Sequence, residues 1–169
     1  TRIANPLAMN LYVLGFNQNK QLTALNQAVK ENLKNYLNHY RILTDAINIK
    51  DAFIINIGIQ FEITVLSNYN SNEVLLKCID AVKTYFNIDR WQINQPIMKS
   101  DVTNLLGNVK GVQSVVNVTF NNLYDTALNY SGNIYDLASA TKNGVIYPSL
   151  DPSIFEVKFP NKDIKGRVI

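Results

Sequence analysis

The sequence predicts an α+β protein with a ferredoxin-like βαββαβ fold, in which two helices cover one face of an antiparallel sheet. Residues 53–65 alternate between apolar and polar side chains, as in a strand with one buried face. Two stretches with apolar residues at helical spacing lie on either side of that strand. The chain has 169 residues, of which 47% are hydrophobic and 17% are charged, so it can bury a core.

The first half of the domain begins with a short strand at residues 10–16. A polar break follows, in which Asn19 is expected to cap a helix of four or five turns. The next strand, around residues 42–49, has an irregular pattern. The expected helix carries one apolar stripe, formed by Leu22, Leu25, Val29, Leu33, Tyr36, Leu37 and Tyr40.

The long strand at residues 53–66 is expected to form the spine of the domain, with its odd-numbered face beneath both helices. The even-numbered face is polar from Asn56 to Thr64 and carries no arginine, lysine or aromatic side chain there. The odd-numbered residues are all apolar: Phe53, Ile55, Ile57, Ile59, Phe61, Ile63 and Val65.

The second half of the domain begins at Asn70, which has the spacing of a capping box with Glu73. A short helix at residues 101–108, capped by Ser100, precedes a fourth strand at 111–120. The main helix is expected to bury Leu75, Cys78, Ile79, Val82, Tyr85 and Phe86, and the fourth strand Val112, Val116, Val118 and Phe120.

The pattern divides the chain into a domain at residues 1–120 and a C-terminal arm at 121–169 with short extended pieces at 145–147 and 154–159. The arm has little core of its own, so it either packs against its own domain or is ordered by a partner. Trp91 either closes one end of the core or anchors a contact. The candidate interface residues are Trp91, Tyr124, Tyr130, Tyr135, Tyr147, Phe155 and Phe159.

The sequence offers no catalytic, cofactor-binding or metal-binding motif, which predicts a protein that is not an enzyme and needs no cofactor. His39 is the single histidine, and Cys78 is the single cysteine and falls on an apolar stripe, as a buried, inert thiol would. No glycine-rich phosphate loop and no paired carboxylates occur. The net charge of +3 is dispersed, so nucleic acid is not an expected partner. The apolar runs are short and interrupted, so a membrane is not expected either.

A second function remains open at this point. Residues 11–16, LYVLGF, resemble the first-strand motif of RNA-recognition domains, whose βαββαβ order also matches. Those domains stack bases on aromatic side chains of the first and third strands, and Tyr12 could supply one of them. The strand at 53–66 lacks the outward aromatic and basic residues that the third strand should carry. An RNA-binding module is therefore the alternative to the leading hypothesis.

The leading hypothesis comes from a resemblance over residues 10–120. Arg41, Leu43, Thr44 and Asp45 precede a short strand and then the long alternating one. Later, SDVTNLLGNVKGVQSVVNV resembles the helix, Gly-Val and strand that end baseplate J-like proteins of contractile-tailed bacteriophages. This chain has Lys-Gly-Val at residues 110–112 where some members have Pro-Gly-Val.

The resemblance implies a structural role in the virion, as the C-terminal part of a baseplate wedge protein of the T-even type. Such proteins associate with themselves and with neighbouring wedge proteins to form a ring around the tail hub. A homodimer or larger homo-oligomer is therefore expected, located in the tail baseplate and, during assembly, in the host cytoplasm.

Overall fold

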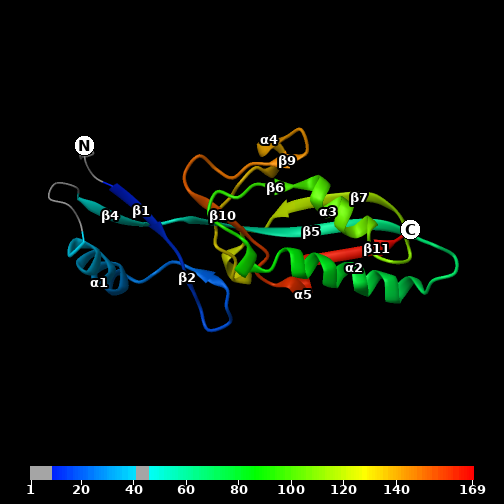
Figure 1. Cartoon of the computed structure of the whole chain (residues 1–169), viewed down its shortest axis with the longest axis horizontal. Coiled ribbons are helices and arrows are strands. Elements are labelled where there is room, and N and C mark those ends of the chain that lie inside the picture. The colour runs from blue at the N-terminus through cyan, green and yellow to red at the C-terminus, as the bar shows by residue number, and fades with distance from the viewer. Residues whose placement is uncertain (1–8, 41–45) are drawn as a thin grey trace. The chain divides into compact units, whose positions relative to one another are not determined.

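The computed structural model describes residues 9–40 and 46–169 and shows a mixed α+β protein (Figure 1). The chain forms two compact units, residues 1–52 and 53–169, called here the N-terminal and C-terminal units. The boundary expected at residue 120 falls inside the C-terminal unit. It does so because strands from the expected arm pair with the long strand at its centre.

The described part of the N-terminal unit, residues 9–40 and 46–52, contains one helix and two small sheets. Strand β1 (Met9–Val13) pairs in parallel with β4 (Ile47–Asp51), and β2 (Gly15–Phe16) pairs antiparallel with β3 (Leu22–Thr23). Helix α1 spans Gln27–Asn38. The start of the strand expected around 42–49 lies outside the described residues, and its end corresponds to β4.

Helix α1 begins later than the sequence predicted. Its cap is Asn26, whose side chain accepts a hydrogen bond from the backbone N–H of Val29 at 2.9 Å. Asn19 lies instead in a tight turn, where its N–H donates to the side chain of Asn17 at 2.9 Å. The prediction of Asn19 as cap was wrong because Leu22 belongs to β3 and does not continue the helical stripe.

The sheet of the C-terminal unit is built around β5 (Phe53–Val65). Strand β7 (Val112–Asn122) runs antiparallel to β5, whereas β10 (Ser153–Glu156) and β11 (Ile164–Val168) run parallel to it. Helix α5 (Pro160–Asp163) interrupts the C-terminal segment between its two strands.

Strands β10 and β11 share one edge of β5. The N–H of Phe53 donates to Pro152 at that edge, and the carbonyl of Ile63 accepts from Ile169. The backbone N–H and C=O groups of odd-numbered residues in β5 thus point toward the C-terminal segment, at one edge of the strand. At the other edge, the carbonyl of Asn56 accepts a hydrogen bond from the N–H of Leu123, next to β7. The sheet is mixed, so the single antiparallel sheet that was expected does not form, and the ferredoxin-like arrangement is not confirmed.

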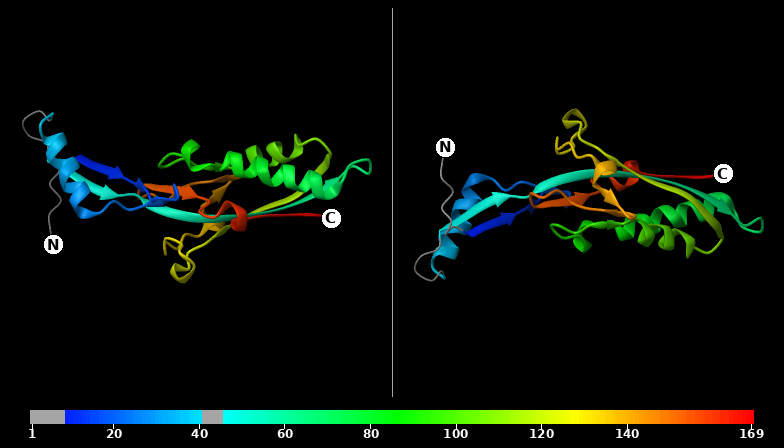
Figure 2. Two further views of the ribbon diagram at one scale, coloured as in Figure 1. Left: turned by 90° about the horizontal axis from the view of Figure 1, so that it is seen from below. Right: turned by 90° about the horizontal axis from the view of Figure 1, so that it is seen from above.

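Two helices cover the odd-numbered face of this sheet (Figure 2). Helix α2 (Ser71–Tyr85) packs against β11, and α3 (Lys99–Gly107) packs against β7. Asn70 caps α2 as predicted, with its side chain accepting from the N–H groups of Asn72 and Glu73. Ser100 does not cap α3, because that helix already begins at Lys99.

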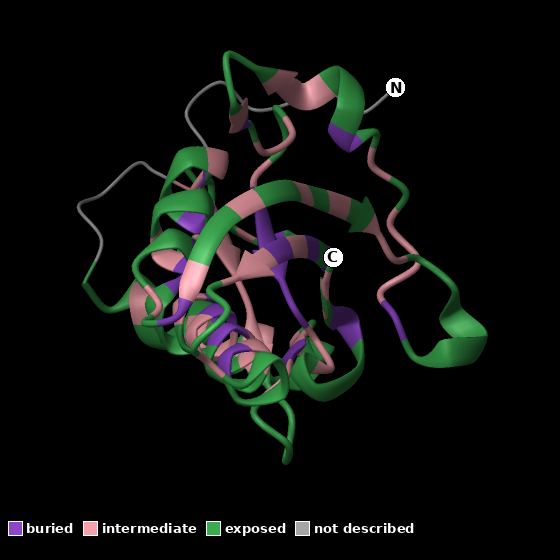
Figure 3. Ribbon diagram, turned by 90° about the vertical axis from the view of Figure 1, so that its right-hand side faces the viewer, coloured by how far each residue is buried: buried purple, intermediate pink, exposed green. Residues whose placement is uncertain are grey.

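The core lies between the sheet and these helices. Residues at the centre of β5 are fully enclosed, as predicted, but Phe53 at its start is 46% exposed. Val116 is also exposed, because the pairing of β7 with β5 shifts register beside it and Val115 takes the place opposite Ile63. In Figure 3, β7 shows half-buried and exposed residues, in agreement with its burial pattern.

Part of the even-numbered face of β5 is covered by the chain itself. The carbonyl of Ile54 accepts hydrogen bonds from the side chains of Ser131 and Asn133 at 2.7 and 2.9 Å. Asn56 is buried, donates to Glu156 at 2.8 Å and accepts from the N–H of Ser131. The segment that contains Ser131 and Asn133 therefore closes this face over the first half of β5 (Figure 2).

A small sheet completes the C-terminal unit. It contains β6 (Ile97–Met98), β9 (Val145–Ile146) and β8 (Thr141–Lys142), and the short helix α4 (Leu137–Ala140) directly precedes β8. Asn143 and Gly144 join β8 to β9 with φ angles of 52° and 76°, as a two-residue hairpin turn requires. The extended piece predicted at residues 145–147 corresponds to β9.

Candidate interaction surfaces

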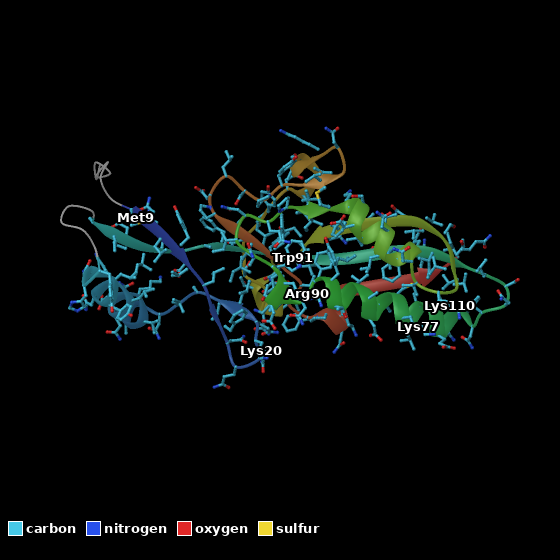
Figure 4. The ribbon with its side chains drawn as sticks, viewed as in Figure 1. Met9, Lys20, Lys77, Arg90, Trp91 and Lys110 are labelled. Carbon is cyan, nitrogen blue, oxygen red and sulfur yellow. The ribbon has the colours of Figure 1, made fainter. Side chains whose placement is uncertain are left out.

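Three of the predicted interface residues lie in the core of the C-terminal unit. Trp91, which is labelled in Figure 4, is 7% exposed. It stacks on Phe86 with ring centroids 5.2 Å apart and donates its indole N–H to the carbonyl of Tyr85 at 3.1 Å. Phe155, in β10, is 2% exposed, and Tyr130 is 7% exposed. Trp91 therefore closes one end of the core, and none of the three presents a ring to solvent.

Tyr130 forms part of a buried polar contact on the far side of the sheet. Its hydroxyl donates to Asp163 at 2.6 Å, and the other oxygen of Asp163 accepts from the N–H of Phe159 at 3.2 Å. Burial, together with the negative charge of Asp163, raises the pKa of Tyr130. The ring of Phe159 meets that of Tyr130 edge to face at 5.6 Å, so both aromatic residues hold α5 against the sheet.

The remaining predicted residues are more accessible. Tyr124 and Tyr147 are 49% and 48% exposed. Tyr135 is half-buried, donates its hydroxyl to the carbonyl of Tyr147 at 2.6 Å, and lies 6.2 Å from the ring of Phe155. Tyr124 and Tyr147 are thus the two predicted aromatic residues that offer substantial apolar area for a partner.

The sequence analysis missed exposed aliphatic residues between residues 121 and 169, among them Leu128, Ile134 and Leu150. Phe53, at the start of β5, is exposed as well. Phe53, Ile134 and Tyr135 line a shallow hollow of 210 Å³ together with Asn133, Ser149 and Asp151. Apolar residues in a segment rich in turns carry no periodic signal, so the sequence alone could not separate them from core residues.

A second accessible apolar surface lies on α1. The helix has an apolar stripe, but no residue of α1 is buried. Val29, Tyr36 and Tyr40 are 44%, 59% and 71% exposed, and the rings of the two tyrosines lie 5.2 Å apart. A hydrogen bond with Tyr40 is the main cause that raises the pKa of Tyr36. We call Val29, Tyr36 and Tyr40 the α1 patch.

Another side of α1 is held to β4. Lys30 pairs with Asp51 at 2.5 Å, and their side chains are 16% and 34% exposed. This ion pair turns one flank of the helix toward its own sheet and leaves the α1 patch outside. The N-terminal unit therefore encloses few side chains, which include Leu22, Ile47 and Ala52.

The described residues hold few groups suited to chemistry. Among residues 9–40 and 46–169, no cluster of three or more histidine, cysteine, aspartate or glutamate side chains could hold a metal ion. Cys78 is fully buried, as predicted, and burial raises its pKa to about 11, so the thiol is protonated at neutral pH. His39 lies at the exposed C-terminal end of α1.

The strand pairing bears on the RNA-binding alternative. A base-stacking platform requires the strand of Tyr12 to lie beside the long strand in one sheet. In the described part of the chain, β1 pairs with β4, and β5 pairs with β7, β10 and β11. The two strands that should carry the stacking residues are therefore not neighbours in a sheet, so the strand pairing does not support this alternative.

Comparison with known proteins leaves the family open. No protein-family model matches the chain, and a search of curated proteins finds no match. In the part of the chain that the structure describes, no helix is both long and apolar enough to cross a lipid bilayer.

Proposed function

We propose that the chain is a non-enzymatic structural protein of a contractile phage tail, a part of a baseplate wedge that associates with itself and with neighbouring wedge proteins. The resemblance of residues 10–120 to baseplate J-like proteins supports the tail assignment. The accessible apolar surfaces of both units support a role in assembly. The proposed location is the tail baseplate, and the proposed partners are a second copy and other wedge proteins.

The observation that carries the proposal is the exposed apolar face of α1. A helix with a marked apolar stripe normally buries that stripe against its own domain. Here α1 has no buried residue, and the α1 patch exposes two tyrosines, a residue type enriched at interfaces. In an assembly, a partner would supply the cover that the N-terminal unit lacks.

A solution experiment tests the self-association. We expect the wild-type chain to form a dimer or larger oligomer in sedimentation velocity runs at increasing concentration, and a Val29→Ser/Tyr36→Ser variant to sediment as a monomer. The matched control is Leu76→Ser, which changes an exposed residue of α2 (63% exposed) and should leave the oligomer intact. A wild-type chain that remains monomeric at all concentrations would overturn self-association through this surface.

A second experiment tests the tail assignment. Contractile-tailed particles would be purified from the phage that encodes the chain, and their tails separated into baseplate and tube fractions. We expect peptides of this chain in the baseplate fraction, at a constant ratio to the other wedge components. Intact, infectious particles that lack these peptides would overturn the assignment, whatever the oligomeric state of the isolated chain.

A further inference from the structure

The polar face of the β5 sheet contains a hollow that the proposed function does not use. Its volume is 170 Å³, and it lies where β5, β7, α5 and β11 come together. Gly58, Ile59 and Tyr130 are buried and form its bottom, while Leu128 is 49% exposed at its side. Its exposed polar lining consists of Gln60, Asn121, Lys162 and Lys165.

The bottom of the hollow depends on a glycine within a strand. A Cβ atom added to Gly58 would lie 3.2 Å from Cδ1 of Leu123 and 3.4 Å from the carbonyl oxygen of Asp163. A glycine inside a strand weakens it, and it often marks a place where another group approaches the backbone closely. A larger side chain at this position would occupy the space beside Leu123, so Gly58 keeps the hollow open.

The lysines around the hollow carry positive charge, and the ammonium of Lys162 lies 6.0 Å from the centre of the Tyr130 ring. Lys162 and Lys165 are exposed, and no carboxylate within the described residues lies within ion-pair distance of either. The carboxylate of Asp163 also lines the hollow, but its two oxygens already accept hydrogen bonds from Tyr130 and Phe159. The rim therefore carries two lysines that could pair with an anion from outside the chain.

The next cation along β11 is different, because it is already paired. Arg167 forms an ion pair with Glu62 across the sheet. The side chain of Glu62 is 26% exposed, and this glutamate is the neighbouring carboxylate on the same face of β5. On β11, Arg167 is therefore neutralised by a carboxylate of its own chain, whereas Lys165 at the hollow has no ion-pair partner among the described residues.

We propose that this hollow binds an acidic peptide segment of a partner protein, with one apolar side chain inserted between Leu123, Leu128 and Tyr130 and its carboxylates paired with Lys162 and Lys165. The size supports a single apolar group, since a cavity of about 150 Å³ accommodates benzene. The carboxylates provide the specificity, because an apolar peptide alone would leave both lysines unpaired. The proposal does not depend on a place in a phage tail.

The test is a titration of the full chain, labelled with ¹⁵N, with the peptide acetyl-Glu-Glu-Leu-Glu-Glu-amide. We expect saturable shifts of the backbone amide signals of Gly58, Gln60 and Leu128, weaker at 200 mM than at 20 mM salt because exposed charge pairs are screened. Two control peptides replace every glutamate by glutamine or the leucine by glycine, and both should bind at least several-fold more weakly. Equal shifts with all three peptides, or no shift, would overturn the proposal.

Variants of the protein locate the binding site. Lys162→Gln with Lys165→Gln should weaken binding by roughly twofold to thirtyfold, the range for two exposed ion pairs. Lys110→Gln with Lys142→Gln makes the same change in net charge at exposed lysines that do not line the hollow, and should leave the affinity unchanged. Leu128→Gln tests the apolar contact at an exposed position, where folding is not at risk. Equal losses in both lysine pairs would show a general charge effect and overturn the proposed site.

Discussion

Helices α1 and α2 are both amphipathic, but they have different surroundings in the structure. Each carries an apolar stripe, and each begins at an asparagine cap. Helix α2 buries Val74, Cys78 and Val82 against the sheet of the C-terminal unit, whereas α1 buries no residue. The pattern of a helix thus shows which of its faces is apolar, but not whether its own chain covers that face.

The difference arises from the strands available to each helix. The C-terminal unit places β7, β10 and β11 along β5, so α2 and α3 meet a broad apolar surface. The N-terminal unit offers α1 a sheet of two parallel strands, and a two-stranded sheet gives little area to bury against. We therefore expect the C-terminal unit to hold most of the folding free energy, and the N-terminal unit to depend on a partner.

The largest expected effect is that of Ile57→Asn. Ile57 is fully enclosed at the centre of β5, so the change opens a cavity and buries an amide without hydrogen-bond partners. We expect the free energy of unfolding of the C-terminal unit to fall by about 3–5 kcal/mol, measured by urea denaturation. Val29→Asn in the α1 patch, which belongs to the other unit, is the control, and it should change the free energy of unfolding of the C-terminal unit by about 0.5 kcal/mol or less. Equal losses at the two positions would contradict the contrast between the units.

The sequence predicts β5 and the start of α2 well because both depend on local signals. The alternation of residues 53–65 identifies a strand and its buried centre, and Asn70 precedes α2 with the spacing of a cap. The partners of β5 are less predictable. Strands β10 and β11 pair with residues about 100 positions earlier, and short extended pieces carry no signal for the strand that they will join.

The choice of candidate interface residues shows a similar limit of prediction from the sequence. Tyr124 and Tyr147 are accessible, but Trp91, Tyr130 and Phe155 are buried, although all five were selected as aromatic residues outside the main periodic elements. An aromatic side chain stabilises a core and an interface by the same burial of apolar area, so residue type does not separate the two. The separation follows from tertiary contacts, such as the stacking of Trp91 on Phe86.

The second-largest expected effect comes from a substitution where α2 and β11 approach each other closely. A Cβ atom added to Gly166 would overlap the ring of Phe61 and lie 2.9 Å from Cδ1 of Leu75, so Gly166→Ala should destabilise the C-terminal unit by about 1–3 kcal/mol. Gly107→Ala makes the same chemical change at the end of α3, where no atom lies within 4 Å of the new methyl group. There we expect a gain of up to about 1 kcal/mol, because alanine favours helix. Thermal unfolding measures both, and two effects of equal sign would refute this account of the packing.

The smallest effect compares the two helix caps directly. Asn70→Ala and Asn26→Ala each remove side-chain hydrogen bonds to the first turn of a helix, at a local cost of about 1 kcal/mol. Because α2 is packed into the core, the first change should lower the protection of amides throughout the C-terminal unit in hydrogen exchange. The second change should increase exchange in α1 alone, since few buried contacts couple α1 to other elements.

Asn72→Ala, in the same turn of α2 but not a cap, should leave exchange of the C-terminal unit unchanged. If Asn26→Ala reduced protection in the C-terminal unit as much as Asn70→Ala does, the two units would unfold together, and α1 would be stabilised by its own chain after all.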